Sequence, residues 1–262
     1  MRRILAISKN TYLEAVRSNI LYSVLFFAAL IIAISAVFGS VSIGEQYLVV
    51  KSFGYTIISL SAVICTILSG ISLFQKEITQ KTIYNILSKP VSRTEFLLGK
   101  LLGLVLTTWT LSAIMILCLL LFVMPLEGRF DFIGFQALIV ICLEVIIVSC
   151  LTLFFSSLAV TPVLPGIFTL SSYIAGKSIF YLNYFIVDEK CQDCESLPSL
   201  VTFFIRLLSW VLPDLHALTP YDRLLYQVSL SIYEISLLVI YTLFYSLILF
   251  LLSNIIFSKR EL

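Results

Sequence analysis

The sequence predicts an all-α integral membrane protein with six transmembrane helices, and three observations support that fold class. Of its 262 residues, 60% are hydrophobic and only 12% are charged, against roughly 45–50% and 25% in soluble domains. The apolar residues fall into six stretches of about 20 residues or more, enough for a helix to cross a ~30 Å hydrocarbon core. Cationic side chains collect in residues 1–18, in residues 75–100 and at the C-terminal end, segments that alternation of the spans places on one side of the membrane, as the positive-inside rule requires.

The chain begins with a segment, residues 1–18, that does not have the form of a signal peptide. Ser8, Lys9 and Asn10 interrupt its apolar run, and no small-residue cleavage site follows. Apolar and charged residues can gather on opposite sides of a helix here, so we expect an elbow helix at the membrane interface. The first span is predicted at residues 19–39, followed by an outer loop at 40–52 and a second span at 53–74.

The longest polar interval, residues 75–100, holds five cations and two acids. From Glu77 to Leu87 apolar residues recur at helical spacing, and Pro90 stops the run. Ser92 and Glu95 then have the spacing of a capping box at the start of a helix that leads into the third span. This pattern predicts a short amphipathic helix on the cytoplasmic side. The alternative is a charged loop that only sets topology.

The remaining spans are predicted at residues 101–124, 132–159, 166–187 and 234–257, with turns at 125–131 and 160–165. Inner connections carry eleven cations and outer ones five, so both termini are expected in the cytoplasm. In the long outer region, residues 200–212 are apolar but too short to cross. We expect an amphipathic or re-entrant segment there, acting either as a lid or lateral gate or as a membrane-anchored connector. Thr219, as cap, and Pro220 predict a further helix start.

Two ionisable residues lie inside predicted spans, Glu144 in the fourth and Lys177 in the fifth. An ionised side chain at the centre of a span costs about 2.5–3.5 kcal/mol on insertion scales. Because the midpoint between the two positions falls at Val160, Thr161 and Pro162 in the tight turn, an antiparallel hairpin brings them to about the same depth. We therefore predict an intramembrane ion pair that fixes the register of the two helices. The alternative is that one of the two residues lines a substrate path or relays protons.

Cys191 and Cys194 form a C-x-x-C pair in the outer region, where thiols can oxidise. We expect a local disulfide, with a thiol or copper site as the alternative. No metal site is predicted, because a zinc site needs four ligands and His216 is too isolated to act as more than a hydrogen-bonding residue. Residues 176–178 resemble the last three residues of a nucleotide-binding loop, but the glycine that must precede them is absent. If the protein uses ATP, another chain must therefore bind it.

Three groups of residues together carry a family resemblance: residues 9–17 before the first span, a set that follows the second span, and residues 154–162 (FFSSLAVTP). The set comprises Glu77, Thr82, Leu87, Lys89, Pro90, Arg93, Phe96, Gly99 and Lys100. This pattern resembles the permease subunits of type-2 ABC exporters, and within that class the NosY-like branch associated with maturation of multicopper enzymes. Lys81 departs from the pattern, because such proteins often carry Gly there.

The resemblance implies that a separate ATP-binding cassette subunit docks on the cytoplasmic helix and binds ATP and Mg, with no cofactor in this chain. Two such subunits would serve two permeases, the second being another copy of this chain or a homologous one. The residues that would bind the ATPase subunit are Glu77, Thr82, Leu87, Lys89, Pro90 and Arg93. The chain would be a transport subunit and not an enzyme, exporting an unidentified substrate from the cytoplasm or inner leaflet.

Two other functions remain open at this point. The chain could be a stand-alone channel or proton-coupled carrier that works through Glu144 and Lys177. It could also be an intramembrane enzyme acting on lipids, or on thiols through Cys191 and Cys194. In every case we expect residues 1–262 to form a single transmembrane domain in the cell membrane, in contact with lipid and without a nucleic-acid partner.

Overall fold

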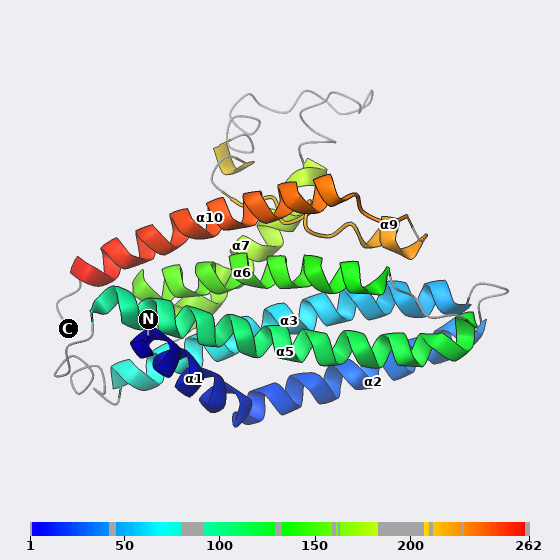
Figure 1. Ribbon diagram of the computed structural model, residues 1–262, viewed down its shortest axis with the longest axis horizontal. Coiled ribbons are helices and arrows are strands. Elements are labelled where there is room, and N and C mark those ends of the chain that lie inside the picture. The colour runs from blue at the N-terminus through cyan, green and yellow to red at the C-terminus, as the bar shows by residue number, and fades with distance from the viewer. Residues whose placement is uncertain are drawn as a thin grey trace.

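A computed structural model describes residues 2–41, 46–79, 92–128, 133–158, 161, 163–182, 207–209, 212–226 and 228–259. Within those ranges the regular structure is helical and includes no strand. Most of the long helices run along one axis of the molecule, while α1 is set obliquely at one end, close to the C-terminal end of α10 (Figure 1). The helices are α1 Arg2–Val16, α2 Asn19–Val41, α3 Gln46–Thr79, α5 Arg93–Glu127, α6 Gly134–Leu158, α7 Val163–Leu182, α9 Tyr221–Leu225 and α10 Ile232–Lys259.

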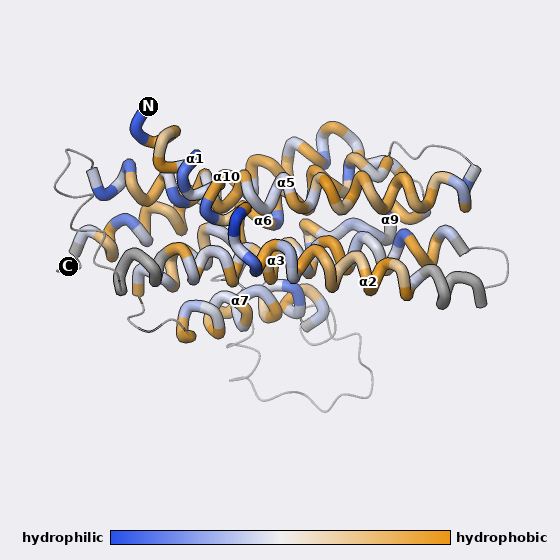
Figure 2. Tube along the Cα trace, turned by 90° about the horizontal axis from the view of Figure 1, so that it is seen from below, coloured by the Kyte–Doolittle hydropathy of each residue, from blue (hydrophilic) through white to orange (hydrophobic). Residues whose placement is uncertain are grey.

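Five of these helices, α3, α5, α6, α7 and α10, are each long and apolar enough to cross a membrane. Helix α2 meets the same test together with α1, from which it is bent by 56°, so the described residues contain five or six candidate spans. Hydrophobic residues dominate the long helices, whereas α1 carries a run of hydrophilic ones (Figure 2). The prediction of an all-helical membrane protein is confirmed.

The centre of the bundle is built on α3 and α6. Helix α3 packs against α2, α5 and α6, and α6 packs in turn against α5, α7 and α10. Large side chains are completely enclosed between these helices, among them Tyr55, Ile58, Leu119, Ile141 and Ile147. Apolar side chains on the outside of the bundle can face lipid at no cost, so the closely packed side chains are those between helices.

Helix α1 lies against the first half of α5. A Cβ atom added to Gly103 of α5 would be 2.5 Å from Cβ of Thr11 and 2.8 Å from the carbonyl oxygen of Ser8. Both α1 residues are buried. Only a glycine permits so close an approach of the two helices, and this contact holds α1 at an angle to α2. The position of α1 at the membrane interface stays a prediction.

Helix α5 begins at the predicted capping box. The amide of Glu95 donates to Oγ of Ser92 at 3.2 Å, and the amide of Ser92 donates to Oε2 of Glu95 at 3.1 Å. Ser92 has the extended backbone (φ −71°, ψ 150°) of an N-cap residue. The sequence prediction of this helix start is therefore confirmed.

Three predicted connections are wrong in their bounds. The turn expected at 160–165 is shorter than predicted, because α7 already begins at Val163. Residues 46–52, expected in an outer loop, form the first turns of α3. Pro125, expected in a turn, lies inside α5, which continues to Glu127 and ends at Gly128 with φ 73°. The physical reason is that Lys51 and Glu127 neutralise each other, so these charges do not mark helix ends. Gly128 supplies the left-handed residue that ends α5.

The chain between α7 and α10 is described at residues 207–209, which are helical, at 212–226 and from 228 onward. Helix α9 starts at Tyr221, directly after Pro220, close to the predicted start. The hydroxyl of Thr219, expected to cap this helix, donates to the carbonyl oxygen of His216 at 2.9 Å and closes the preceding turn. The rest of the predicted segment 200–212 lies outside the described residues.

Candidate functional site

A buried carboxylate lies inside the bundle, and four side chains converge on it. Glu144 of α6 has no exposed surface. The hydroxyl of Ser59 donates to Oε2 at 2.7 Å, and the hydroxyl of Tyr173 donates to Oε1 at 3.1 Å. Nζ of Lys177 lies 3.1 Å from Oε1, and the hydroxyl of Tyr221 donates to Oε2 at 3.4 Å. We call these five residues the Glu144 cluster.

The cluster joins α6 to three other elements. Ser59 comes from α3, Tyr173 and Lys177 from α7, and Tyr221 from α9. Residues four apart on a helix lie on the same face, which places the Tyr173 ring beside the Lys177 ammonium, with Nζ 4.9 Å from the ring centroid. An aromatic ring face attracts a cation at this distance. The Glu144 carboxylate and the Tyr173 ring therefore both hold the Lys177 ammonium.

Tyr221 reaches Glu144 because residues 213–218 pack against α7. A Cβ atom added to Gly176 would be 2.6 Å from the carbonyl oxygen of Pro213. The amide of Leu215, whose side chain is completely buried, donates to the carbonyl oxygen of Gly176 at 3.3 Å. The amide of Asp214 donates to the hydroxyl of Tyr241 on α10 at 2.8 Å. The connection between α7 and α10 is thus a packed part of the bundle here.

The cluster satisfies Glu144 completely but leaves Lys177 partly accessible. A buried carboxylate is tolerated when a cation and hydrogen-bond donors replace its hydration, and Glu144 has one cation and three hydroxyl donors. The side chain of Lys177 is 32% exposed, whereas that of Glu144 is 0% exposed. This arrangement can hold four elements together and can also present an ammonium group to an anion at the surface of the bundle.

A second buried ion pair joins α3 to α5. Nζ of Lys51 lies 2.5 Å from Oε2 of Glu127, and both side chains are buried. Sequence reasoning placed both residues in outer connections and missed the pair. The sequence does contain a signal for this pair. Lys51 and Glu127 lie about equally far along the chain from the middle of the interval 75–100, so two antiparallel helices bring them to the same depth.

A protein-family model described as ABC-2 family transporter protein matches residues 16–182. The match covers more than half of the chain, from the end of α1 to the end of α7. The chain belongs to the ABC-2 family of transporter proteins. It is accordingly a multi-span membrane permease of the ABC transporter class, and members of this class work with an ATP-binding cassette subunit. A comparison with curated proteins gives no match.

In this ABC-2 permease the residues expected to bind the ATPase subunit fall between α3 and α5. Glu77 lies in the last turn of α3, which ends at Thr79. Arg93 is the first residue of α5, and its guanidinium donates to the carbonyl oxygens of Phe257 and Ser258 at 3.2 and 2.9 Å. A cation is favourable at the C-terminal end of a helix such as α10. The other members of the set, Thr82, Leu87, Lys89 and Pro90, lie outside the described residues.

The remaining candidate residues of the permease lie at the end of α7 and between α7 and α10, in the region predicted to be outer. Cys191 and Cys194 are outside the described residues. The His216 ring stacks on the Phe180 ring at 4.1 Å between centroids, and the Tyr181 ring lies nearly perpendicular to it, 5.1 Å away between centroids. Over the part of the chain that the structure describes, no three His, Cys, Asp or Glu side chains lie close enough together to hold a metal ion.

Proposed function

We propose that this chain is the permease subunit of an ABC exporter, which moves its substrate out of the cytoplasm or inner leaflet with ATP hydrolysed by a separate subunit. The observation that carries the proposal is the family match over residues 16–182. That match includes the interval 75–100, whose residues resemble the ATPase-docking region of such permeases. We propose further that the chain belongs to the NosY-like branch of these permeases, which its residue pattern resembles.

The proposed assembly has two permeases and two ATP-binding cassette subunits. The excess of cations in the interval 75–100 and at both ends of the chain favours a cytoplasmic position for these parts. The start of α5 and the end of α10 lie at the same end of the molecule, because Arg93 contacts the last turn of α10. ATP and Mg would bind to the partner subunits, and this chain would supply the surface to which the partner subunits bind.

Coupling in this proposal is mechanical. A partner that binds ATP more tightly in one conformation shifts the equilibrium between two arrangements of the spans. Force applied between α3 and α5 would reach both helices directly, since α3 ends and α5 begins in this interval. Because Arg93 also contacts the end of α10, movement of α5 would be transmitted to α10.

Affinity purification of the tagged chain from its native membrane, followed by mass spectrometry, tests the proposal. We expect an ATP-binding cassette subunit to co-purify and its ATPase activity to depend on the permease. Glu77→Arg should reduce the recovered partner about tenfold or more, the effect of losing one charge-assisted contact. Glu234→Arg is the charge-reversal control, because Glu234 lies in the first turn of α10, away from the end of α3 and the start of α5 (Figure 1). Its folded yield is measured as well, since this change also breaks the ion pair with Arg223.

Two results would contradict the proposal. One is a purified chain that lacks an ATP-binding partner under conditions that preserve membrane complexes. The other is full partner binding and ATP-dependent transport by a variant that carries both Glu77→Arg and Arg93→Glu.

The Glu144 cluster supports a second candidate function, a channel or proton-coupled carrier. A buried carboxylate with a partly exposed lysine beside it is the type of group that lines ion or proton paths in membranes. Flux through the purified chain in liposomes without ATP, abolished by Glu144→Gln, would favour this function over the exporter.

A further inference from the structure

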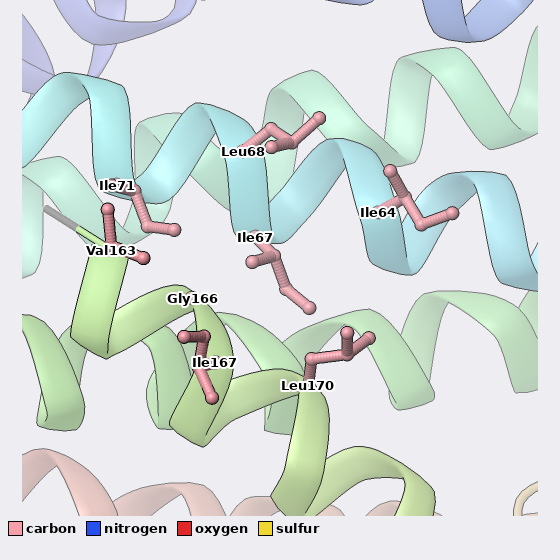
Figure 3. Close-up of a pocket in the computed structure, with 8 residues that line it drawn as sticks. All are labelled: Ile64, Ile67, Leu68, Ile71, Val163, Gly166, Ile167 and Leu170. Carbon is pink, nitrogen blue, oxygen red and sulfur yellow. The ribbon is translucent and has the colours of Figure 1, made fainter.

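An open groove runs between α3 and α7 on the outside of the bundle (Figure 3). Its volume is 420 Å³, within the roughly 300–1,000 Å³ of small-molecule sites. All the residues that line it are apolar or glycine, four from each helix: Ile64, Ile67, Leu68, Ile71, Val163, Gly166, Ile167 and Leu170. A polar ligand would gain nothing from this lining, so the groove suits a hydrocarbon chain.

Gly166 gives the groove its depth. A Cβ atom at this position would lie 2.8 Å from Cδ1 of Ile71 across the groove. Any side chain here would therefore fill part of the space between the two helices. Figure 3 shows Gly166 between Val163 and Leu170 on the α7 side, facing the isoleucines of α3.

The face of α7 that lines the groove continues to Lys177. Val163, Leu170 and Lys177 are seven residues apart in succession, which is close to two helical turns, so they lie on one face of α7. At 1.5 Å per residue, Lys177 is about 10 Å beyond Leu170 and about 21 Å beyond Val163. The groove itself ends at Ile64 and Leu170. A long-chain amphiphile whose chain fills the groove would place an anionic head group on Lys177 by continuing along this face of α7.

Lys177 can receive such a head group without leaving Glu144 unsatisfied. The ammonium has three donors, and its side chain is 32% exposed. One of these donors stays on Oε1 of Glu144, 3.1 Å away, and the others remain for an anion outside the cluster.

We propose that the α3–α7 groove and Lys177 bind an anionic amphiphile, with its acyl chain between the two helices and its carboxylate or phosphate on the Lys177 ammonium. The inference rests on the proposed permease function and names the chemical class of its substrate. Both a free fatty acid and an anionic phospholipid have this chemistry.

Photolabelling of the purified chain in phosphatidylcholine nanodiscs tests the proposal. Three diazirine probes are compared: palmitic acid, palmityl alcohol, and phosphatidylglycerol with one photoreactive acyl chain. Mass spectrometry then locates the labelled peptides. We expect at least one anionic probe to label residues 64–71 and 163–170 about tenfold more than the alcohol does, the factor typical of one charge-assisted hydrogen bond. Labelling by the acid alone identifies a free acid, and labelling by phosphatidylglycerol alone identifies a lipid head group.

Variants separate the roles of the charge and the groove. Lys177→Met should lower labelling by the anionic probe to the level of the alcohol, whereas Lys177→Arg should preserve it. Leu170→Trp fills the groove, leaves the ion pair intact and should abolish specific labelling even if Lys177→Met does not fold. The matched control is Leu243→Trp on α10, an exposed position outside the groove.

Two outcomes would overturn the proposal. Equal labelling by acid, phosphatidylglycerol and alcohol, unchanged in Leu170→Trp, would show that ordinary bilayer chains fill the groove. An unlabelled groove, together with cross-linking of two copies through Leu170→Cys, would show that a second permease covers it. These experiments need no ATP and no partner subunit, so a failure here is distinct from failure to recover an ATP-binding partner.

Discussion

Lys51 and Glu127 form an ion pair that joins the first turns of α3 to the last turn of α5. Nζ of Lys51 is 2.5 Å from Oε2 of Glu127, with 0% and 4% of the two side chains exposed. The Lys51 ammonium also lies 5.6 Å from the Tyr47 ring centroid. The pair therefore links two long helices at the end of the molecule opposite α1 (Figure 1).

Exchanging the two charges of this pair should preserve the fold, whereas reversing one should not. Lys51→Glu alone places two carboxylates together in a buried site, and disruption of a buried pair costs about 3–5 kcal/mol. Adding Glu127→Lys restores the opposite charges. Fluorescence-detected size exclusion in detergent measures the folded fraction. Equal yields for the single and double variants would show that the pair does not hold these helices together.

Glu144 and Lys177 should depend on each other energetically in a double-mutant cycle. Glu144→Gln leaves Lys177 without its counter-ion, and Lys177→Met leaves a buried carboxylate with hydroxyl donors only. The double variant removes both charges, so the combined loss of stability should be smaller than the sum of the single losses by about 0.5–3 kcal/mol. Thermal unfolding of the purified variants gives the comparison. Additive effects would contradict a direct interaction.

Hydropathy predicts the long helices well, because a segment in an apolar phase must form all its backbone hydrogen bonds internally and therefore becomes a helix. Hydropathy fails at helix ends where a charged residue is neutralised by a residue far away in the sequence. By hydropathy Lys51 is predicted to lie in an outer loop, because its charge is not expected inside a helix of the bundle. The ion pair with Glu127 allows it to lie in α3. Pro125 likewise reads as a turn, although α5 continues for two more residues.

The Glu144 site was predictable only in part. Hairpin symmetry brings Glu144 and Lys177 to one depth, and the structure has them 3.1 Å apart. Ser59 could not be identified, because a hydroxyl in an apolar helix more often bonds its own backbone, as the neighbouring Thr66 and Ser61 do. Tyr221 could not be identified either, since its position depends on how residues 213–218 pack against α7 and α10.

Gly103→Leu should release α1 from α5. The added side chain would overlap Thr11 and the carbonyl of Ser8, and overpacking of this type costs about 1–3 kcal/mol. Tryptic cleavage after Lys9 should become faster, because α1 would no longer be held against the bundle. Leu102→Ala is the matched control, as Leu102 precedes Gly103 and is exposed. Unchanged cleavage in Gly103→Leu would mean that α1 stays in place by other contacts.

Tyr221→Phe should loosen residues 213–224 without unfolding the bundle. The substitution removes only the hydroxyl that donates to Glu144 at 3.4 Å, and a hydrogen bond to a charged group contributes about 1.5–3 kcal/mol at good geometry. The distance is long, so we expect the lower end of that range. Hydrogen exchange should then accelerate at the amides of Leu215 and Leu218, which are bonded within this segment and to α7.

Tyr226→Phe is the control for this last prediction, because Tyr226 lies just after α9 and is 70% exposed. It should leave exchange at Leu215 and Leu218 unchanged. The same exchange rates in both variants would mean that Leu215, Leu218 and Leu224, all completely buried, hold the segment by apolar packing alone. In that case the Tyr221 hydroxyl would serve only to satisfy Glu144, and Tyr221→Phe should lower the stability of the whole bundle instead of the local exchange protection.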